Sequence, residues 1–433
     1  MTQPHDRFSF LSFRFLSTLG SSCALTLTAL MMTPNGSLSE IPAQATLKDS
    51  PKAVLDEAWQ IVNREYVDPQ FNHVNWQQVR QQLLSRSYPN QEAAYAALKD
   101  ALKRLNDPYT RFLDPKEFQA LNTDDIDGEV TGVGLQLQLD SQHQALKVVK
   151  ALEQSPALRA GVQAGDTVLE INGRSTKGMS IETATRLIRG PAKTSVKLLL
   201  SRPQHPSFAV TLTRQRLELP VVYSALRQEG NQRIGYIQLN EFSGHAAEQM
   251  QQAIAHLTRQ QVDRFVLDLR GNPGGLLDQE TAIARMWLDR GAIVRIVDRS
   301  GAAEQIQANH TALTNRPLAV LVDGGSASAS EILTGALKDN HRAIVIGTQT
   351  FGKALVQSVN SLSDGSGLNV TIAHYFTPAG LDINHRGIKP DVVLSLTQHK
   401  RQELSSHPDE LGTDQDPQYE QAVGMRNNVG IAQ

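Results

Sequence analysis

Apolar residues recur at helical spacing along the first part of the chain. Within Ala53–Val62, and again within Ala93–Leu105, they return every three or four residues. Asn106-Asp107-Pro108 ends the second set by its turn chemistry. The pattern predicts helices with one apolar face, and we expect residues 46–125 to form a helical region that serves packing or dimerisation and carries no chemistry.

Shorter apolar runs divide the rest of the chain. Alternation typical of strands, with two brief helical patterns, fills residues 126–215, which we expect to be a separate domain. From Leu219 strands and helices alternate, which favours an α/β core with parallel pairing over residues 216–396. The strands predicted for that core are Ile234–Leu239, Phe265–Leu269, Ile293–Val297 and Leu318–Val322, with helices that include Ala246–Leu257 and Gln279–Trp287.

Residues 397–433 form a polar tail. Gln398–Gln415 is charged and has little apolar patterning, so we expect a mobile linker there. Asp416–Val423 is expected to be one last helix.

A strand that runs straight into a helix carries the first chemical feature. Pro317–Val322 is an apolar run of strand type, Asp323-Gly324-Gly325 breaks it, and a helix follows from Ser330. A hydroxyl at such a junction can face a cleft, and the N–H groups of the helix start favour a developing negative charge. The junction therefore predicts a nucleophilic serine. Because serines at helix starts are most often caps, local chemistry leaves the choice among Ser326, Ser328 and Ser330 open.

Two further segments can complete an active site. Lys353 and Gln357 lie four residues apart, so they share one side of the backbone in a strand or a helix, and one can orient the other. A lone lysine after glycine is more often a solvated surface cation. Asp268–Gly275 ends a strand in a sharp turn of Pro and paired Gly, which we expect to leave a bare N–H pointing from the loop; a tight turn without function is the alternative.

Composition narrows the class of protein. The chain has 433 residues and is 40% hydrophobic, which is enough for two or three domain cores. A formal charge of −2 and an aromatic content of 5% give no sign of a nucleic-acid partner. Metal-dependent hydrolysis is a weaker alternative, because no His-Glu-x-x-His or similar spacing occurs. We expect no metal and no other cofactor.

The N-terminus has the order of an export signal. Arg7 and Arg14 precede a mostly apolar run, Leu16–Met32, and Pro42–Ala45 supplies small residues for cleavage after residue 45. An uncleaved anchor is the alternative. The only cysteine, Cys23, lies in this segment, so the mature chain can have no disulfide and no cysteine nucleophile.

The serine and lysine segments resemble the signature of the carboxyl-terminal processing peptidases, or tail-specific proteases. They run Ser326-Ala-Ser-Ala-Ser-Glu-Ile332 and Thr350-Phe-Gly-Lys-Ala-Leu-Val-Gln357, and look most like the cyanobacterial and plastid members. The resemblance implies that Ser328 is the nucleophile, that Lys353, 25 positions later, is its base, and that Gln357 orients the lysine. It maps two oxyanion donors onto the N–H groups of Gly274 and Ala329. One departure is Ala354, where the family usually has Gly.

Residues 126–215 resemble a PDZ domain in the circularly permuted form of bacterial proteases, notably in Thr131–Leu135 and Gly165–Gly173. The resemblance implies that backbone N–H groups of Gly132, Val133, Gly134 and Leu135 bind a peptide's terminal carboxylate, while the next strand pairs with the peptide. A simple strand-end turn is the alternative. The fold class expected is therefore multi-domain α/β: a crotonase-like, Clp-protease-like core with an inserted PDZ domain and an N-terminal helical region.

Together these features imply a serine endopeptidase with a Ser–Lys dyad. It would recognise the C-terminal ends of proteins through its PDZ domain and process or degrade exported proteins, in the periplasm or the thylakoid lumen. Its partners would be protein substrates and, through the N-terminal helices, a second copy of the chain. Lys353 must be neutral to act as a base, which requires a desolvated site that lowers its pKa.

Two rivals stay open. A Ser–His–Asp hydrolase has four candidate histidines, although Gly324–Ser328 is not a Gly-x-Ser-x-Gly elbow. These candidates are His310, His341, His374 and His385. A PDZ scaffold on an inactive core is the other, although the intact Ser328, Lys353 and Gln357 argue against it.

Overall fold

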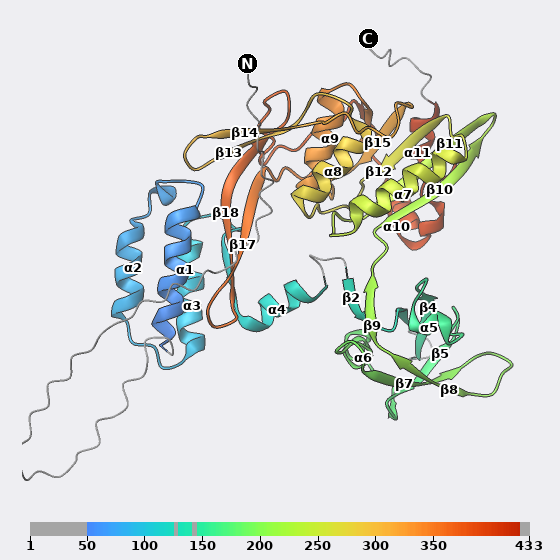
Figure 1. The fold of residues 1–433 in the computed structure, drawn as a ribbon, viewed down its shortest axis with the longest axis horizontal. Coiled ribbons are helices and arrows are strands. Elements are labelled where there is room, and N and C mark those ends of the chain that lie inside the picture. Colours follow the sequence, from blue (N-terminus) through green and yellow to red (C-terminus); the bar gives the residue numbers. More distant parts are fainter. Residues whose placement is uncertain (1–49, 125–128, 141–144, 425–433) are drawn as a thin grey trace, which may run out of the picture. The chain divides into compact units, whose positions relative to one another are not determined.

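The computed structural model describes residues 50–124, 129–140 and 145–424 (Figure 1). The predicted signal segment, residues 1–45, lies outside this range, as do residues 425–433. Among the described residues, no helix combines the length and the apolar character needed to cross a bilayer.

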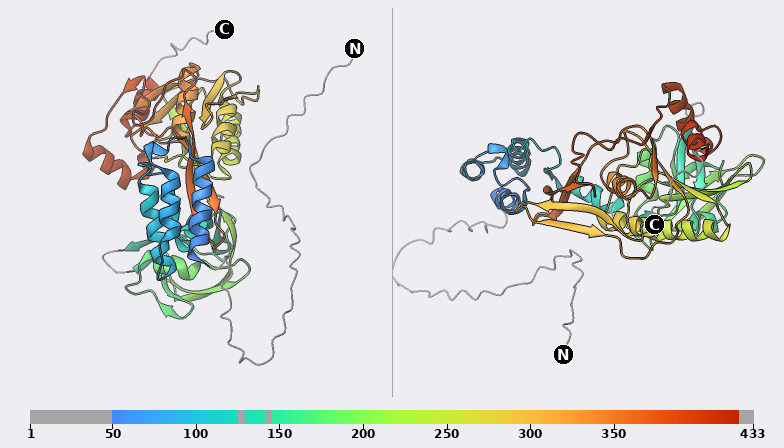
Figure 2. Two further views of the ribbon diagram at one scale, coloured as in Figure 1. Left: turned by 90° about the vertical axis from the view of Figure 1, so that its left-hand side faces the viewer. Right: turned by 90° about the horizontal axis from the view of Figure 1, so that it is seen from above.

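Three helices form at the N-terminal positions that the apolar spacing predicts. They are α1 (Pro51–Glu65), α2 (Trp76–Ser85) and α3 (Gln91–Lys103), with a short turn of 3-10 helix, Phe71–His73, between the first two. Ser50, Asn75 and Asn90 cap them by accepting backbone N–H groups. The helices lie side by side in Figures 1 and 2, and their apolar faces form one buried cluster that takes in Leu368 and Val370. These faces are therefore used within the chain.

The cluster rests on an antiparallel sheet of order β1-β18-β13-β14, with β17 also paired to β18. Its strands are β1 (Arg111–Leu113), β13 (Ala292–Asp298), β14 (Ala303–Gln307), β17 (Leu355–Ser361) and β18 (Gly367–Phe376); α4 (Pro115–Asp124) follows β1. The prediction that Ile293–Val297 joins the parallel core is wrong. This strand pairs antiparallel with β14 and β18, because only part of it is buried and Arg295 faces solvent.

The next region folds around a sheet of order β3-β4-β5-β7-β8, in which β3 is an edge strand. The strands are β3 (Leu135–Asp140), β4 (Ala145–Ala151), β5 (Thr167–Ile171), β6 (Arg174–Ser175), β7 (Ser195–Ser201) and β8 (Phe208–Thr213), and the helices are α5 (Pro156–Arg159) and α6 (Ile181–Ile188). Strands β2 (Glu129–Gly132) and β9 (Gln215–Glu218) pair at its entrance and exit. The region has an apolar cluster of its own.

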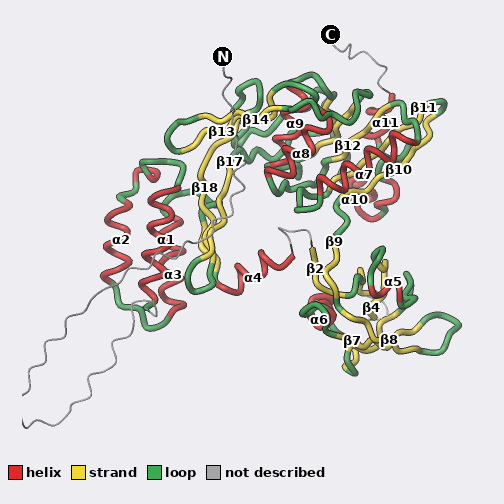
Figure 3. The backbone as a smooth tube through the Cα atoms, in the orientation of Figure 1, coloured by secondary structure: helices red, strands yellow, loops and turns green. Residues whose placement is uncertain are grey.

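The central sheet has the order β10-β11-β12-β15-β16-β19 and is parallel from β11 onward. Its strands are β10 (Val222–Glu229), β11 (Gln232–Leu239), β12 (Arg264–Asp268), β15 (Leu318–Val322), β16 (Ile344–Gly347) and β19 (Val392–Val393). Helices α7 (Ala246–Arg259), α8 (Leu277–Trp287) and α9 (Ala329–Asp339) lie beside this sheet (Figure 3). The three helices and the sheet share one large apolar cluster. Strands β12 and β15 are buried along their whole length, as parallel strands with both faces covered must be.

The C-terminal segment is ordered, so the prediction of a mobile linker over Gln398–Gln415 is wrong. It forms α10 (Gln398–Ser406), the 3-10 turn Pro408–Glu410 and α11 (Pro417–Gly424), where one last helix is expected. Tyr419 and Ala422 pack on the second face of the central sheet. A buried network anchors the segment: Arg270, directly after β12, donates to Asp268 and Asp416, with Nη2 to Asp416 Oδ2 at 2.6 Å. Composition alone does not reveal such a long-range pair.

Asp416→Ala should lower the free energy of unfolding by about 3 kcal/mol, because it leaves part of the Arg270 charge buried without its partner. Glu420→Ala, on the exposed face of α11, is the matched control and should change the free energy by less than about 0.5 kcal/mol. Urea unfolding followed by circular dichroism measures both. Equal losses at the two positions would contradict the role of the network.

Candidate active site

The three candidate serines at the start of α9 have different surroundings. Ser326 and Ser330 are fully buried, and their hydroxyls donate to the carbonyl oxygens of Leu269 at 2.8 Å and Asn272 at 3.0 Å. Ser328 is the N-cap residue of α9 and stays partly exposed. The outer two serines therefore stabilise the turn, and only the middle one keeps access to solvent.

The backbone of Ser328 is strained. Its φ is 54° and its ψ is −116°, a conformation that residues with a Cβ rarely adopt. Such strain costs on the order of 1–3 kcal/mol and is found mainly where surrounding contacts hold a side chain for a function. The turn thus presents the Ser328 side chain at the first N–H groups of a helix.

The carboxylate of Glu331 joins the serine turn to the lysine loop. Its Oε2 accepts the backbone N–H of Ser328 at 3.0 Å and that of Lys353 at 2.9 Å. Its Oε1 accepts from Gly352 N at 2.7 Å and Thr350 Oγ1 at 2.5 Å. Glu331 is fully buried, and burial raises its pKa above the usual range although all four donors lower it. Two segments that are distant in the sequence therefore share one oxygen atom.

The hydroxyl of Tyr375 makes a second bridge between the same segments. It donates to the carbonyl oxygen of Ser328 at 3.2 Å and also contacts that of Lys353. Tyr375 lies on β18 and is buried. The structure thus brings Ser328 and Lys353 into one site by contacts on the N–H and the C=O of both residues.

The side chain of Lys353 is partly withdrawn from water. Its Nζ lies 4.7 Å from the ring centroid of Tyr109. Burial lowers the pKa of Lys353, and the positive charge of Arg111 lowers it further, whereas Asp107 and Glu331 act in the opposite direction. A lowered pKa is what Lys353 requires in order to be neutral and act as a base.

No hydrogen bond joins Gln357 to Lys353 among the described residues, although the spacing predicts that one orients the other. Strand β17 begins at Leu355, after the lysine, and a bulge follows Val356, so the two residues share no continuous strand. Among the described residues, the hydrogen bond of Gln357 Nε2 goes to Thr371 Oγ1, at 3.5 Å.

The turn after β12 packs directly on the serine turn. A Cβ added to Gly274, whose φ is 103°, would lie 2.8 Å from Ser328 Cβ and 3.0 Å from Ala329 N, so glycine is required there. Asp323 also joins the turns, since its Oδ1 accepts the N–H groups of Gly271 and Gly325, both at 2.9 Å. The two predicted oxyanion donors therefore belong to neighbouring segments.

The expectation of a bare N–H at this turn is wrong for Gly274. Its N–H donates to Asn272 Oδ1 at 2.9 Å, because the buried Asn272 side chain folds back over the turn. The N–H of Ala329 has no acceptor among the described residues. In this conformation only one of the two predicted donors is free.

The predicted peptide-binding residues line the start of edge strand β3. Val133 is buried, and Gly134, with φ 77°, leaves no room for a Cβ beside Ser155. The carbonyls of Val133 and Gly134 are used inside the domain, by Ala157 N and Leu152 N. Gly132 is the last residue of β2, and Leu135 is the first of β3.

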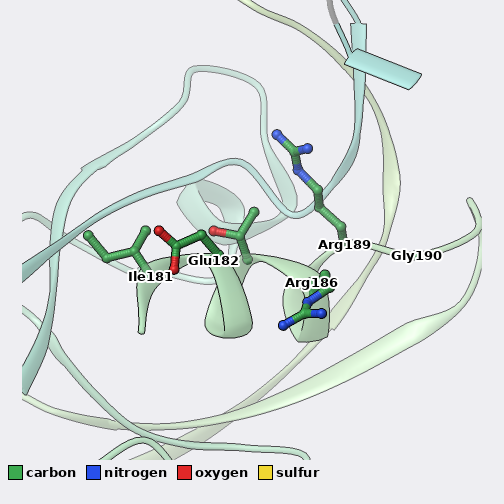
Figure 4. Close-up of a pocket in the computed structure, with 6 residues that line it drawn as sticks. Ile181, Glu182, Arg186, Arg189 and Gly190 are labelled. Atoms are coloured by element: carbon green, nitrogen blue, oxygen red, sulfur yellow. The ribbon is translucent and has the colours of Figure 1, made fainter. Parts of the chain in front are cut away.

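A separate pocket of about 540 Å³ lies along α6, next to β3 (Figure 4). Figure 4 shows Ile181, Glu182 and Arg186 on the helix and Arg189 beyond its end. The lining also includes Thr185 and Gly190 but none of residues 132–135, so the pocket and the predicted carboxylate site are adjacent features of the domain rather than one cavity.

The histidine and metal alternatives find no support in the described part of the chain. His310 Nδ1 lies 3.1 Å from Asp289 Oδ2, but both side chains are largely exposed. No side-chain hydrogen bond or ion pair joins any histidine of residues 50–124, 129–140 and 145–424 to Ser328. The same residues contain no group of three or more His, Cys, Asp or Glu placed to hold a metal ion.

Three residues that contact the proposed dyad have no role in the sequence-based prediction: Glu331, Tyr375 and Tyr109. Glu331 follows Ser328 by three positions, which is the spacing of a capping box, and that signal could have marked it. No spacing in the sequence places Tyr109 beside Lys353, because this contact depends on the pairing of β1 with β18.

Comparison with known proteins decides the family. Residues 233–394 match the model of peptidase family S41, and residues 147–202 match that of the PDZ domain. A carboxyl-terminal-processing protease of Picosynechococcus is 41% identical over 373 residues, which are 86% of this chain and 88% of the relative. The chain belongs to peptidase family S41. It is a serine-type, C-terminal-processing peptidase, and it acts on protein substrates.

Other relatives support the same assignment. The chloroplastic C-terminal processing peptidase of Tetradesmus obliquus is 39% identical, over 82% of this chain and 79% of its own length. The solved structure named photosystem II D1 C-terminal processing protease is 37% identical, with a TM-score of 0.54 over 80% of this chain and 93% of that structure. The expected fold class, a mixed α/β protease with a PDZ domain, is confirmed.

Proposed function

We propose that this peptidase cleaves peptide bonds with a Ser328–Lys353 dyad. The shared hydrogen bonds of Ser328 and Lys353 to Glu331 Oε2 are the main support, because they hold the two residues in one site. Ser328 Oγ would attack the substrate carbonyl while neutral Lys353 accepts its proton and returns it to the leaving amine. The Gln357 side chain would leave its hydrogen bond to Thr371 and then align the Lys353 amine.

The oxyanion would be stabilised by the N–H groups of Ala329 and Gly274. Ala329 N is the first N–H of α9 and has no acceptor among the described residues. Gly274 N must first leave Asn272 Oδ1, so a small movement of this turn would accompany substrate binding.

Substrate selection would take place in the PDZ domain. The N–H groups of Gly132, Val133, Gly134 and Leu135 would bind a terminal carboxylate, and the substrate would pair with the open edge of β3. We further propose that the chain is exported, to the periplasm or the thylakoid lumen, and trims or degrades proteins there. Dimerisation through the N-terminal helices is a further proposal, which sedimentation velocity of the purified protein tests.

The decisive experiment uses one unstructured protein with two different ends. Purified protease is incubated with this substrate carrying either a free or an amidated C-terminus. We expect kcat/KM to fall about tenfold to hundredfold on amidation, because charge-assisted hydrogen bonds to the carboxylate are lost. Ser328→Ala protease is the control and should cleave neither. Equal rates for the two ends would disprove recognition of the C-terminus, and cleavage by the control would disprove the dyad.

A further inference from the structure

The turn before β1 reaches the proposed dyad from the N-terminal helical region. The sequence assigns no chemistry to this region, yet the Tyr109 ring centroid lies 4.7 Å from Lys353 Nζ. Tyr109 is half-buried, and its own pKa is raised by burial and then by the charges of Asp107 and Glu331. The aromatic face therefore lies against the amine at the edge of the active site.

Hydrogen bonds join this turn to β18 and to the side chain of Asp107. Asp107 accepts the backbone N–H of Tyr109 at 2.9 Å and the hydroxyl of Thr110 at 2.7 Å. The Thr110 hydroxyl in turn accepts the N–H of Thr371 at 3.0 Å, and Thr110 is buried. These contacts fix the backbone of Tyr109 beside β18.

Strand β18 also contacts β17, the strand that follows Lys353 and contains Gln357. Thr371 is the register partner of Gln357 in the pairing of β17 with β18 and accepts its side-chain hydrogen bond. Strand β1 pairs with β18 next to it, with Arg111 opposite Asn369. Strand β18 therefore joins the turn that carries Tyr109 to the segment that follows Lys353.

We propose that Tyr109 is a positioning residue for Lys353. The Tyr109 ring holds the Lys353 amine in place and excludes water from it, so the turn before β1 is part of the active site. This inference rests on the proposed function of Lys353. The ring attracts a cation and so favours the ammonium form, while the burial that it provides favours the neutral amine. The other charged groups that face Lys353 are Asp107 in the turn, Arg111 on β1 and Glu331 on α9.

Substitutions at Tyr109 separate positioning from simple packing. Tyr109→Phe keeps the aromatic face and should leave the pH profile of kcat/KM close to that of the wild type. Tyr109→Leu keeps an apolar cover but loses the attraction for the cation. The limb in which activity rises with pH should therefore move about 0.5 to 1 unit toward lower pH. If Tyr109 only packs, both variants lose stability and neither shifts this limb.

The variant Arg111→Gln should shift the pH dependence of activity in the opposite direction. Arg111 is exposed, and its charge disfavours the ammonium form of Lys353, so its removal should move the limb a few tenths of a unit toward higher pH. The shift should fade in high salt. General destabilisation cannot produce opposite shifts in the two variants. Urea unfolding of each variant checks that the native state is populated throughout the pH range.

The outcomes distinguish this inference from the proposed function. If Lys353→Ala keeps full activity, the dyad itself is wrong. If Lys353 is required but the profiles of Tyr109→Leu and the wild type superimpose, the dyad stands and the role of Tyr109 is overturned. Opposite shifts in Tyr109→Leu and Arg111→Gln, with Tyr109→Phe unchanged, support it.

Discussion

Ser328→Ala should abolish proteolysis, with a fall in kcat of about a millionfold toward the residual rate that binding and the oxyanion donors sustain. The substitution removes the only serine hydroxyl of the turn that is not committed to a carbonyl oxygen. It keeps the Cβ, so the strained backbone of the turn is unchanged, and the free energy of unfolding should fall by about 1 kcal/mol, the usual cost of replacing an N-cap serine with alanine.

Ser326→Ala and Ser330→Ala are matched controls for this prediction. Each loses a buried hydrogen bond to a backbone carbonyl, which should cost about 1 to 3 kcal/mol of stability. Neither removes the proposed nucleophile, so activity at a temperature well below unfolding should persist. Cleavage of an unstructured protein, followed by gel densitometry, compares the three variants. If Ser330→Ala lost proteolytic activity and Ser328→Ala kept it, the assignment of Ser328 as the nucleophile would be wrong.

Much of the central sheet could be predicted because its strands are short, apolar and bounded by glycine turns. Leu318–Val322 is observed with the bounds predicted, since both faces of β15 are covered and no polar position blurs its ends. Strand β13 was wrongly predicted to join the parallel sheet because its apolar run is interrupted by a polar residue. Arg295 lies in the middle of that apolar run, and a half-exposed strand suits an antiparallel partner rather than the buried core.

In the active site, too, features set by neighbouring residues could be predicted, and contacts between distant segments could not. The serine turn has a local signal, because strand, glycine pair and helix follow each other in the sequence. The network of Arg270 with Asp416 and the contact of Tyr109 with Lys353 have none. Each joins segments far apart in the chain, and their geometry depends on how α11 and β1 pack after folding.

Lys353→Ala should lower kcat/KM by about 10⁴-fold if the lysine is the general base. Burial and Arg111 lower the pKa of Lys353, so the wild-type rate should rise with pH through a limb below the ordinary lysine range. The rise occurs because only the neutral amine accepts the serine proton.

The variant Lys353→Arg distinguishes a role of Lys353 as a general base from a role as a positive charge. The guanidinium keeps a positive charge at every accessible pH and cannot accept the proton, so this variant should be as inactive as Lys353→Ala and should show no rising limb. If the role of Lys353 were to attract a substrate carboxylate, Arg would preserve most of the activity. Initial rates on one unstructured substrate between about pH 6 and 10, with unfolding checked at each pH, decide between the two. An active Lys353→Arg enzyme with an unaltered profile would exclude the lysine as base, because its titration would then contribute nothing to the rate.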